Sequence, residues 1–235
     1  MVVSIILLSI GAIMSAIFIT SKVINYTFKT IIFKTVASLF FVALGIYLVA
    51  TTPGQTIFKV FTLLGLCFGL LGDVLLGFKY ITTKTKNIWI LAGMFAFAFG
   101  HIFYILGLFL GFYIQGNVLF IILPFVTSSV LSCLYMIISR RLGVHFGRTL
   151  FPFAVFYISC LTLMVSTAFY MALLHSFSLT TLVMFFIGAV FFTTSDCMLT
   201  GSYFKKGKRA KPYVAICSIC YYVAQFLIAF SIFFL

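Results

Sequence analysis

Eight long apolar runs constrain the fold of this chain more than any other feature of its sequence. A helix needs about 20 apolar residues to cross the hydrocarbon core of a bilayer. Runs of that kind predict membrane helices at 2–20, 32–52, 57–78, 88–111, 117–139, 149–174, 178–201 and 213–235. We therefore expect residues 1–235 to form one all-α transmembrane domain, a polytopic bundle of eight helices. The first run has no basic segment before it, so we interpret it as a helix and not as a cleaved signal peptide.

The composition excludes the main alternatives to a membrane protein. Only 7% of the residues are charged and 64% are hydrophobic, whereas about a quarter of the residues in a soluble domain are charged. A chain this rich in Phe, Leu and Ile is not disordered. All six cysteines lie inside apolar runs, where a reduced thiol acts as a small apolar side chain, so a secreted disulfide scaffold is excluded as well.

The basic residues predict the orientation of the bundle. Fourteen of the fifteen Lys and Arg residues fall on or beside alternate connections: Lys22, Lys29, Lys34, Lys79, Lys84, Lys86, Arg140, Arg141, Arg148, Lys205, Lys206, Lys208, Arg209 and Lys211. The other connections have only Lys59. By the positive-inside rule, the basic connections are cytoplasmic and both termini lie on the non-cytoplasmic side. This pattern explains the net charge of +13, so we expect no nucleic-acid partner, although the basic segment 205–211 could bind anionic membrane lipid.

Two aspartates are the only acidic residues of the chain, and both fall in predicted membrane helices. Asp73 and Asp196 each lie towards the cytoplasmic end of a helix that runs inwards. An Asp at the bilayer centre costs about 2.5–3.5 kcal/mol on insertion scales, so such residues usually have a function. We interpret the pair as the carboxylates of a reaction site. The structural alternative is that each aspartate pairs with a buried cation, for example Lys34 or Lys79.

Other polar side chains are predicted to lie near the aspartates. His101 is mid-way along the fourth helix, with Tyr104 one turn later on the same face, and Tyr222 and Gln225 share a face of the eighth helix. Lys34 lies just inside the second helix, where it either extends to the interface or binds a phosphate or carboxylate. All of them fit one pocket that opens to the cytoplasmic side and reaches about half-way through the bilayer.

Glycines and cysteines have simpler interpretations. Gly93, Gly100 and Gly107 recur every seven residues, and small residues let membrane helices approach closely, which predicts central third and fourth helices. Cys217 and Cys220 have metal-ligand spacing but lie in an apolar helix without further ligands.

The order of several short stretches resembles a known family. These stretches are Phe33-Lys34, Leu70-Leu71-Gly72-Asp73, Gly100-His101-Ile102-Phe103-Tyr104, Tyr135, Tyr157, Gly188-Ala189, Ser195-Asp196, Leu199, Tyr221-Tyr222 and Gln225. In order and spacing they resemble the YhhN-like lysoplasmalogenase family of multi-pass membrane proteins, and the resemblance covers most of the chain. Thr35 follows Lys34 where the family often has proline, which leaves the start of the second helix open.

The resemblance implies an enzyme that hydrolyses the vinyl ether of a lysoplasmalogen to a fatty aldehyde and glycerophosphoethanolamine or glycerophosphocholine. Protonation of the vinyl carbon would give an oxocarbenium ion to which water adds, a use of two carboxylates parallel to that in glycosidases. We expect Asp196 to be the acid and Asp73 the base. His101, Tyr104, Tyr222 and Gln225 would hydrogen-bond the pair, the water or the glycerol, Lys34 could meet the phosphate, and Ser195 would have a supporting role. No cofactor is required.

Three alternatives remain open on the sequence. Intramembrane carboxylates also relay protons in transporters, and a lysophospholipid-binding protein or an acyl-lysophospholipase would have a similar pocket. A metal held by Asp73, His101 and Asp196 is a further alternative, although we expect no metal. The sequence does not fix the headgroup, the oligomeric state or the membrane.

Overall fold

The fold is described by a computed structural model that covers residues 1–79, 85–204, 207 and 210–235. Its helices are α1 (Val2–Ile24), α2 (Phe28–Thr51), α3 (Thr56–Phe78), α4 (Lys86–Phe112), α5 (Leu119–Arg141), α6 (Gly147–Leu174), α7 (Thr180–Phe204), α8 (Lys211–Ser231) and the short η1 (Ile232–Phe234). No strand occurs among the described residues. Five of the basic residues used for the orientation lie outside them: Lys84, Lys205, Lys206, Lys208 and Arg209.

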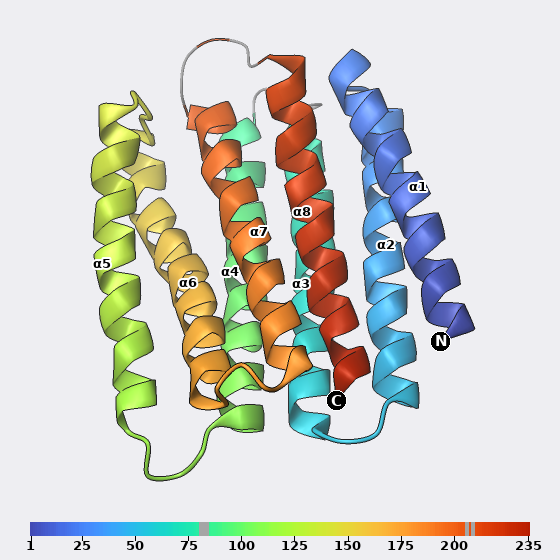
Figure 1. The fold of residues 1–235 in the computed structure, drawn as a ribbon. Coiled ribbons are helices and arrows are strands. Elements are labelled where there is room, and N and C mark those ends of the chain that lie inside the picture. The colour runs from blue at the N-terminus through green and yellow to red at the C-terminus, as the bar shows by residue number, and fades with distance from the viewer. Residues whose placement is uncertain (80–84, 205–206, 208–209) are drawn as a thin grey trace.

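The eight long helices are each long and apolar enough to cross a membrane, as predicted. Figure 1 shows them side by side, with α1 and α2 at one edge of the bundle, α5 and α6 at the other, and α7 and α8 in front of α3 and α4. Many large apolar side chains are exposed along α1 and α5. A protein in water would bury such side chains, so this surface fits a multi-pass integral membrane protein whose outer face meets lipid.

Helix ends differ from the predicted ones by a few residues, and one difference matters for the site. The first apolar run stops before Lys22, but α1 continues to Ile24 and includes Lys22. A lysine can continue a membrane helix because its aliphatic stem stays in an apolar environment while its ammonium reaches a polar one. The first helix therefore carries a cation on its last turn.

The second helix also begins earlier than predicted. Its first residue is Phe28, and Thr27 and Thr30 form a reciprocal capping box at its start. Lys34 therefore lies in the second turn of α2. The helix starts at the capping box, so it does not need a proline at position 35 to define its start. This early start holds Lys34 in a regular helix that faces α3.

Close packing of α3 against α4 depends on glycines, as the sequence predicted. A Cβ at Gly100 would lie 3.1 Å from the backbone oxygen of Gly65, and one at Gly65 would lie 2.2 Å from the ring of Tyr104. The second separation is too short for a methyl group and the first is tighter than most such contacts, so the two backbones approach closely here. The contact fixes the height of Tyr104 relative to α3.

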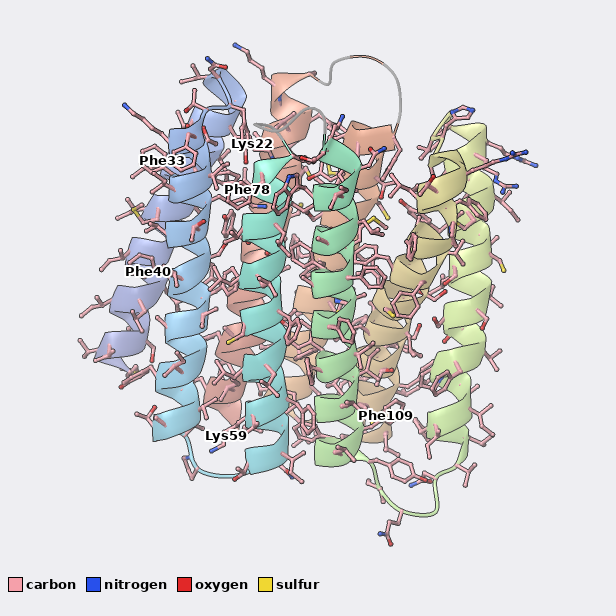
Figure 2. The ribbon with its side chains drawn as sticks, turned by 180° about the vertical axis from the view of Figure 1, so that it is seen from behind. Lys22, Phe33, Phe40, Lys59, Phe78 and Phe109 are labelled. Carbon is pink, nitrogen blue, oxygen red and sulfur yellow. The ribbon has the colours of Figure 1, made fainter. Side chains whose placement is uncertain are left out.

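The two ends of the bundle differ in charge. Figure 2 shows Lys22 near one end and Lys59 near the other. Both chain termini lie at the Lys59 end (Figure 1), as eight crossings require. Lys59 is buried and donates to the backbone oxygen of Thr52 at 2.5 Å. The Lys22 end is the one predicted to be cytoplasmic, and this sidedness stays a prediction.

Candidate active site

Asp73 lies near the end of α3 and is enclosed by donors from two other helices. Its Oδ1 forms an ion pair with Nζ of Lys34 at 2.8 Å, and Lys34 also donates to the backbone oxygen of Asp73 at 3.2 Å. Its Oδ2 accepts the hydroxyls of Ser38 and of Tyr221, the latter at 2.7 Å. Because the side chain is only 2% exposed, these contacts compensate a buried negative charge.

This polar network continues into the bundle through α8 and α4. Gln225 donates from Nε2 to the hydroxyl of Tyr221 at 3.1 Å and accepts from the hydroxyl of Tyr104 at 3.2 Å. Gly69 leaves the space for this amide, since a Cβ there would lie 2.6 Å from its Nε2. The chain of contacts orients Tyr221 towards Asp73 and satisfies an amide that would otherwise be buried without partners.

Asp196 lies in α7 in a different environment. Its Oδ2 accepts the hydroxyl of Tyr157 from α6, and the oxygen of the same hydroxyl lies 3.4 Å from Nε2 of His101. Because Tyr157 gives its proton to Asp196, the contact with His101 requires Nε2 to carry a proton. Nδ1 of His101 is buried without a hydrogen-bond partner among the described residues, which agrees with the tautomer that has its lone pair there.

The partners of the two aspartates differ in charge. Among the described residues, no Lys or Arg lies within ion-pair distance of Asp196, and no hydrogen bond reaches its Oδ1. Asp73 has an ammonium and two hydroxyls on its carboxylate. Asp73 therefore suits a permanent negative charge, whereas Asp196 suits a group that can hold a proton.

Aromatic rings lie between the two polar networks. Phe192 packs edge-on against His101 at 4.9 Å and against Tyr221 at 5.5 Å between ring centroids. Phe97 meets both Phe192 and Tyr221 in the same way. These rings make the inner side of the site apolar.

Both aspartates line a pocket, which lies at the Lys22 end of the bundle. The pocket is narrow, with a cavity volume of about 40 Å³. The lining comes from six helices and one connection: Phe18, Lys22, Tyr26, Lys34, Asp73, Leu76, Phe97, Ser195, Asp196, Leu199, Tyr203, Cys217, Ser218 and Tyr221. Both carboxylates thus line one pocket, and their roles in a reaction stay a prediction.

The other predicted site residues divide into groups. His101 joins the network of Asp196, whereas Lys34, Tyr104 and Gln225 join that of Asp73. Lys34 meets Asp73, which is the contact that the structural alternative foresaw for this aspartate.

Two predicted residues join helices instead of touching an aspartate. Ser195 donates to the backbone oxygen of Cys217 at 2.9 Å, which links α7 to α8. Tyr222 donates to the backbone oxygen of Lys34 at 3.3 Å, which links α8 to α2. Among the described residues, no group of three His, Cys, Asp or Glu side chains could hold a metal ion.

Four residues of the site were not among the predicted site residues. Lys22 was assigned to a connection, and Ser38 gave no signal except its position one turn after Lys34. Tyr157 and Tyr221 belong to the stretches that carry the family resemblance, so that signal could have included them in the site. A tyrosine by itself predicts little in a chain whose residues are 19% aromatic.

Comparison with protein families matches residues 29–232 to the YhhN family. The matched part includes every residue of the two aspartate networks, whereas Lys22 precedes it. Comparisons with curated proteins and with solved structures gave no match.

Proposed function

The chain belongs to the YhhN family, and we propose that it hydrolyses the vinyl ether bond of lysoplasmalogens. The products are a fatty aldehyde and glycerophosphoethanolamine or glycerophosphocholine. The observation that carries the proposal is the pair of buried aspartates that face one pocket with unequal partners, since only Asp73 has an ion-paired cation among the described residues. Vinyl ether hydrolysis needs one carboxyl group that gives a proton and one carboxylate that stabilises a cation.

In the proposed reaction, Asp196 gives its proton to the vinyl carbon farther from the ether oxygen. The other vinyl carbon becomes part of an oxocarbenium ion, which the carboxylate of Asp73 stabilises. Water adds to that carbon, and Asp73 takes the proton that the water loses. The resulting hemiacetal breaks its bond to the glycerol oxygen, which receives the proton from Asp73. The proton of the hemiacetal hydroxyl returns to Asp196 as the aldehyde forms. Asp196 is then protonated and Asp73 ionised, as at the start.

The division of roles follows from the partners of each aspartate. A buried carboxyl group without a compensating cation favours its neutral form, which suits Asp196 as the acid. The ammonium of Lys34 favours the negative charge on Asp73. Tyr157 and His101 are positioning residues in this scheme, because they hold one oxygen of Asp196 and leave Oδ1 free for the substrate.

A proton-coupled transporter is the main alternative class. Transporters often carry their substrate-binding groups on broken helices, but α3 and α7, which carry the aspartates, are continuous helices. Proline occurs inside α5 and α6 at Pro124 and Pro152, and neither lines the pocket. An acyl-lysophospholipase or a lysophospholipid-binding protein would use the same kind of pocket, so substrate chemistry must distinguish these classes.

The deciding experiment offers purified protein matched lysophospholipids with an alkenyl or an acyl chain and measures aldehyde and fatty acid release. We expect aldehyde from the alkenyl substrate alone. Asp196→Asn, which keeps the shape of the side chain, should abolish aldehyde release while the protein stays folded in gel filtration. Thr194→Val is the matched control, because Thr194 lies two residues away on α7, is exposed, and bonds only to its own helix. Wild-type turnover by Asp196→Asn, or fatty acid release from the acyl substrate alone, would contradict the proposal.

A further inference from the structure

A second pocket adjoins the first, and its character is different. It lies between α4, α6 and α7 and is narrow, with a cavity volume of about 40 Å³, so its lining side chains must move apart to admit a chain. The side chains that line only this pocket are mostly apolar: Met94, Phe146, Ala154, Tyr157, Ile158 and Phe204, with Thr200. Such a lining suits a hydrocarbon chain and offers little to a charged group.

Asp196 belongs to both pockets. Leu76, Phe97, Leu199 and Tyr203 also line both, so these five residues form the boundary between them. Asp196 is the acidic residue among these five. A molecule that occupies both pockets must therefore pass the proposed proton donor at the point where its polar part meets its apolar part.

Lys22 supplies a positive charge to the first pocket. Its Nζ donates to Oγ of Ser218 at 2.8 Å, and Ser218 gives its own proton to the backbone oxygen of Val214. Among the described residues, Lys22 forms no ion pair with an acid. Lys34 lines the same pocket, but Asp73 compensates its charge. Lys22 is thus the cation of this pocket that has a neutral partner and can take an anion.

We propose that the two pockets orient one lysophospholipid: its phosphate binds the ammonium of Lys22, its hydrocarbon chain enters the pocket between α4, α6 and α7, and its ether linkage lies at Asp196. This inference rests on the proposed function and adds the direction in which the substrate lies. The order of groups along the lipid is phosphate, glycerol, ether and chain, and the order of features in the structure is the same. An ammonium that donates to a phosphate makes a charge-assisted hydrogen bond, which is among the stronger polar contacts in a protein.

A groove between α1 and α8 is the rival position for the chain. It is apolar and much larger, with a cavity volume of about 510 Å³, and its lining includes Ala16 and Val223. Neither aspartate lines it. A chain in this groove would leave the ether linkage with no acid beside it, so we place the chain in the pocket that Asp196 borders.

The phosphate site is tested by binding, without any need for turnover. The probes are a 1-O-alkyl lysophosphocholine, which lacks the vinyl bond, and the matched 1-O-alkyl glycerol, which lacks the phosphate. We expect Lys22→Gln to weaken binding of the phospholipid roughly 10- to 100-fold, to leave binding of the glycerol unchanged, and Lys22→Arg to restore most of the loss. Lys29→Gln is the matched control, since Lys29 is an exposed lysine at the same end of the bundle. Equal effects on the two probes, or none, would overturn the assignment of the phosphate to Lys22.

The chain site is tested by the dependence of binding on chain length. Ala154→Leu should weaken a 16-carbon probe at least tenfold more than an 8-carbon probe, because Ala154 is buried in the lining of the second pocket. Ala154→Val gives a smaller change in the same direction and is available if the leucine variant does not fold. Ala16→Leu adds the same volume to the rival groove, where Ala16 is exposed. A length-dependent loss in Ala16→Leu and not in the Ala154 variants would place the chain in the groove and overturn the inference.

The binding and activity measurements can contradict the two proposals independently of each other. Binding that depends on Lys22 and Ala154, together with no aldehyde release by the wild type, would contradict the proposed reaction and leave the orientation of the lipid in place. Aldehyde release by the wild type, together with unchanged binding in both sets of variants, would contradict the orientation and leave the reaction in place.

Discussion

At the scale of single residues, the two aspartates of this chain differ in how their burial is compensated. Asp73 has the ammonium of Lys34 at 2.8 Å and the hydroxyls of Ser38 and Tyr221. Asp196 has the hydroxyl of Tyr157. Removing one partner of a buried ion pair leaves an uncompensated charge, whereas removing a proton-carrying carboxyl group does not. Stability measurements can therefore separate the two residues even when both are needed for activity.

We expect Asp73→Asn to destabilise the protein far more than Asp196→Asn. The first change leaves the charged Lys34, whose side chain is only 14% exposed, without its acidic partner, which costs about 3 kcal/mol. The second exchanges one hydrogen-bonding group for another and should change the free energy of unfolding by less than about 1 kcal/mol. Thermal unfolding in detergent micelles compares both variants with the wild type.

The matched control for this prediction is the double variant Lys34→Met with Asp73→Asn. It removes both charges together, so it should recover most of the lost stability while aldehyde release stays absent. Equal destabilisation by Asp73→Asn and Asp196→Asn would show that the ion pair between Lys34 and Asp73 does not contribute as its geometry indicates.

Tyr157 should affect turnover more than stability. Tyr157→Phe keeps the ring but removes the hydroxyl that holds Oδ2 of Asp196 and meets His101. A less well oriented acid should lower kcat roughly 10- to 100-fold with little change in KM. Tyr170→Phe is the control on the same helix, since the ring of Tyr170 packs on Phe120 and Phe169 away from the pocket. An unchanged kcat in Tyr157→Phe would remove Tyr157 from the positioning scheme.

At the scale of helices, the glycines of α3 decide how close the neighbouring helices come. A Cβ at Gly65 would lie 2.2 Å from the ring of Tyr104, which is fully buried. Gly→Ala inside a helix normally stabilises by up to about 1 kcal/mol, but overpacking of a core costs about 1–3 kcal/mol. Whether Gly65→Ala stabilises or destabilises the protein therefore shows how tightly α3 and α4 are packed at this position.

We expect Gly65→Ala to lower the melting temperature and to reduce activity, because Tyr104 would be displaced from Gln225. The measurement is thermal unfolding together with aldehyde release. Leu64→Ala is the control at the adjacent, exposed position of α3. A higher melting temperature for Gly65→Ala than for the wild type would mean that the helices can separate without cost.

The sequence predicted the helices well and their mutual contacts poorly, for a physical reason. An apolar run of 20 residues has few options in a membrane except a spanning helix, so the eight helices and both intramembrane aspartates could be found without a structure. The partner of each aspartate depends on the rotation and depth of α2, α6 and α8. The sequence suggested Lys34 as one option for Asp73, but nothing local indicated that Tyr157 would reach Asp196. Lys22 was missed because the predicted helix ended with the apolar run at residue 20. The helix in fact continues through Lys22, whose aliphatic stem tolerates an apolar environment.

At the scale of the whole molecule, the position of the pocket links the chemistry to the membrane. The pocket opens at the end of the bundle that carries Lys22, opposite the end with both termini (Figures 1 and 2). The positive-inside rule predicts that this end is cytoplasmic. A water-soluble glycerophospho-base would then leave on the cytoplasmic side, while the apolar aldehyde can leave into the membrane.

Glycosylation in microsomes tests this orientation directly. We expect an identical flexible Gly/Ser linker with one Asn-Ser-Thr acceptor to be glycosylated when inserted after Gly116, between α4 and α5. It should remain unmodified when inserted after Asn25, between α1 and α2, because that connection is at the pocket end. The natural acceptor Asn25-Tyr26-Thr27 should also remain unmodified. The same linker fused to the C-terminus is the control, since the C-terminus lies at the end of the bundle opposite Lys22 (Figures 1 and 2). Glycans at the Asn25 insertion and not at Gly116 would reverse the orientation, and the pocket would then release its polar product on the other side of the membrane.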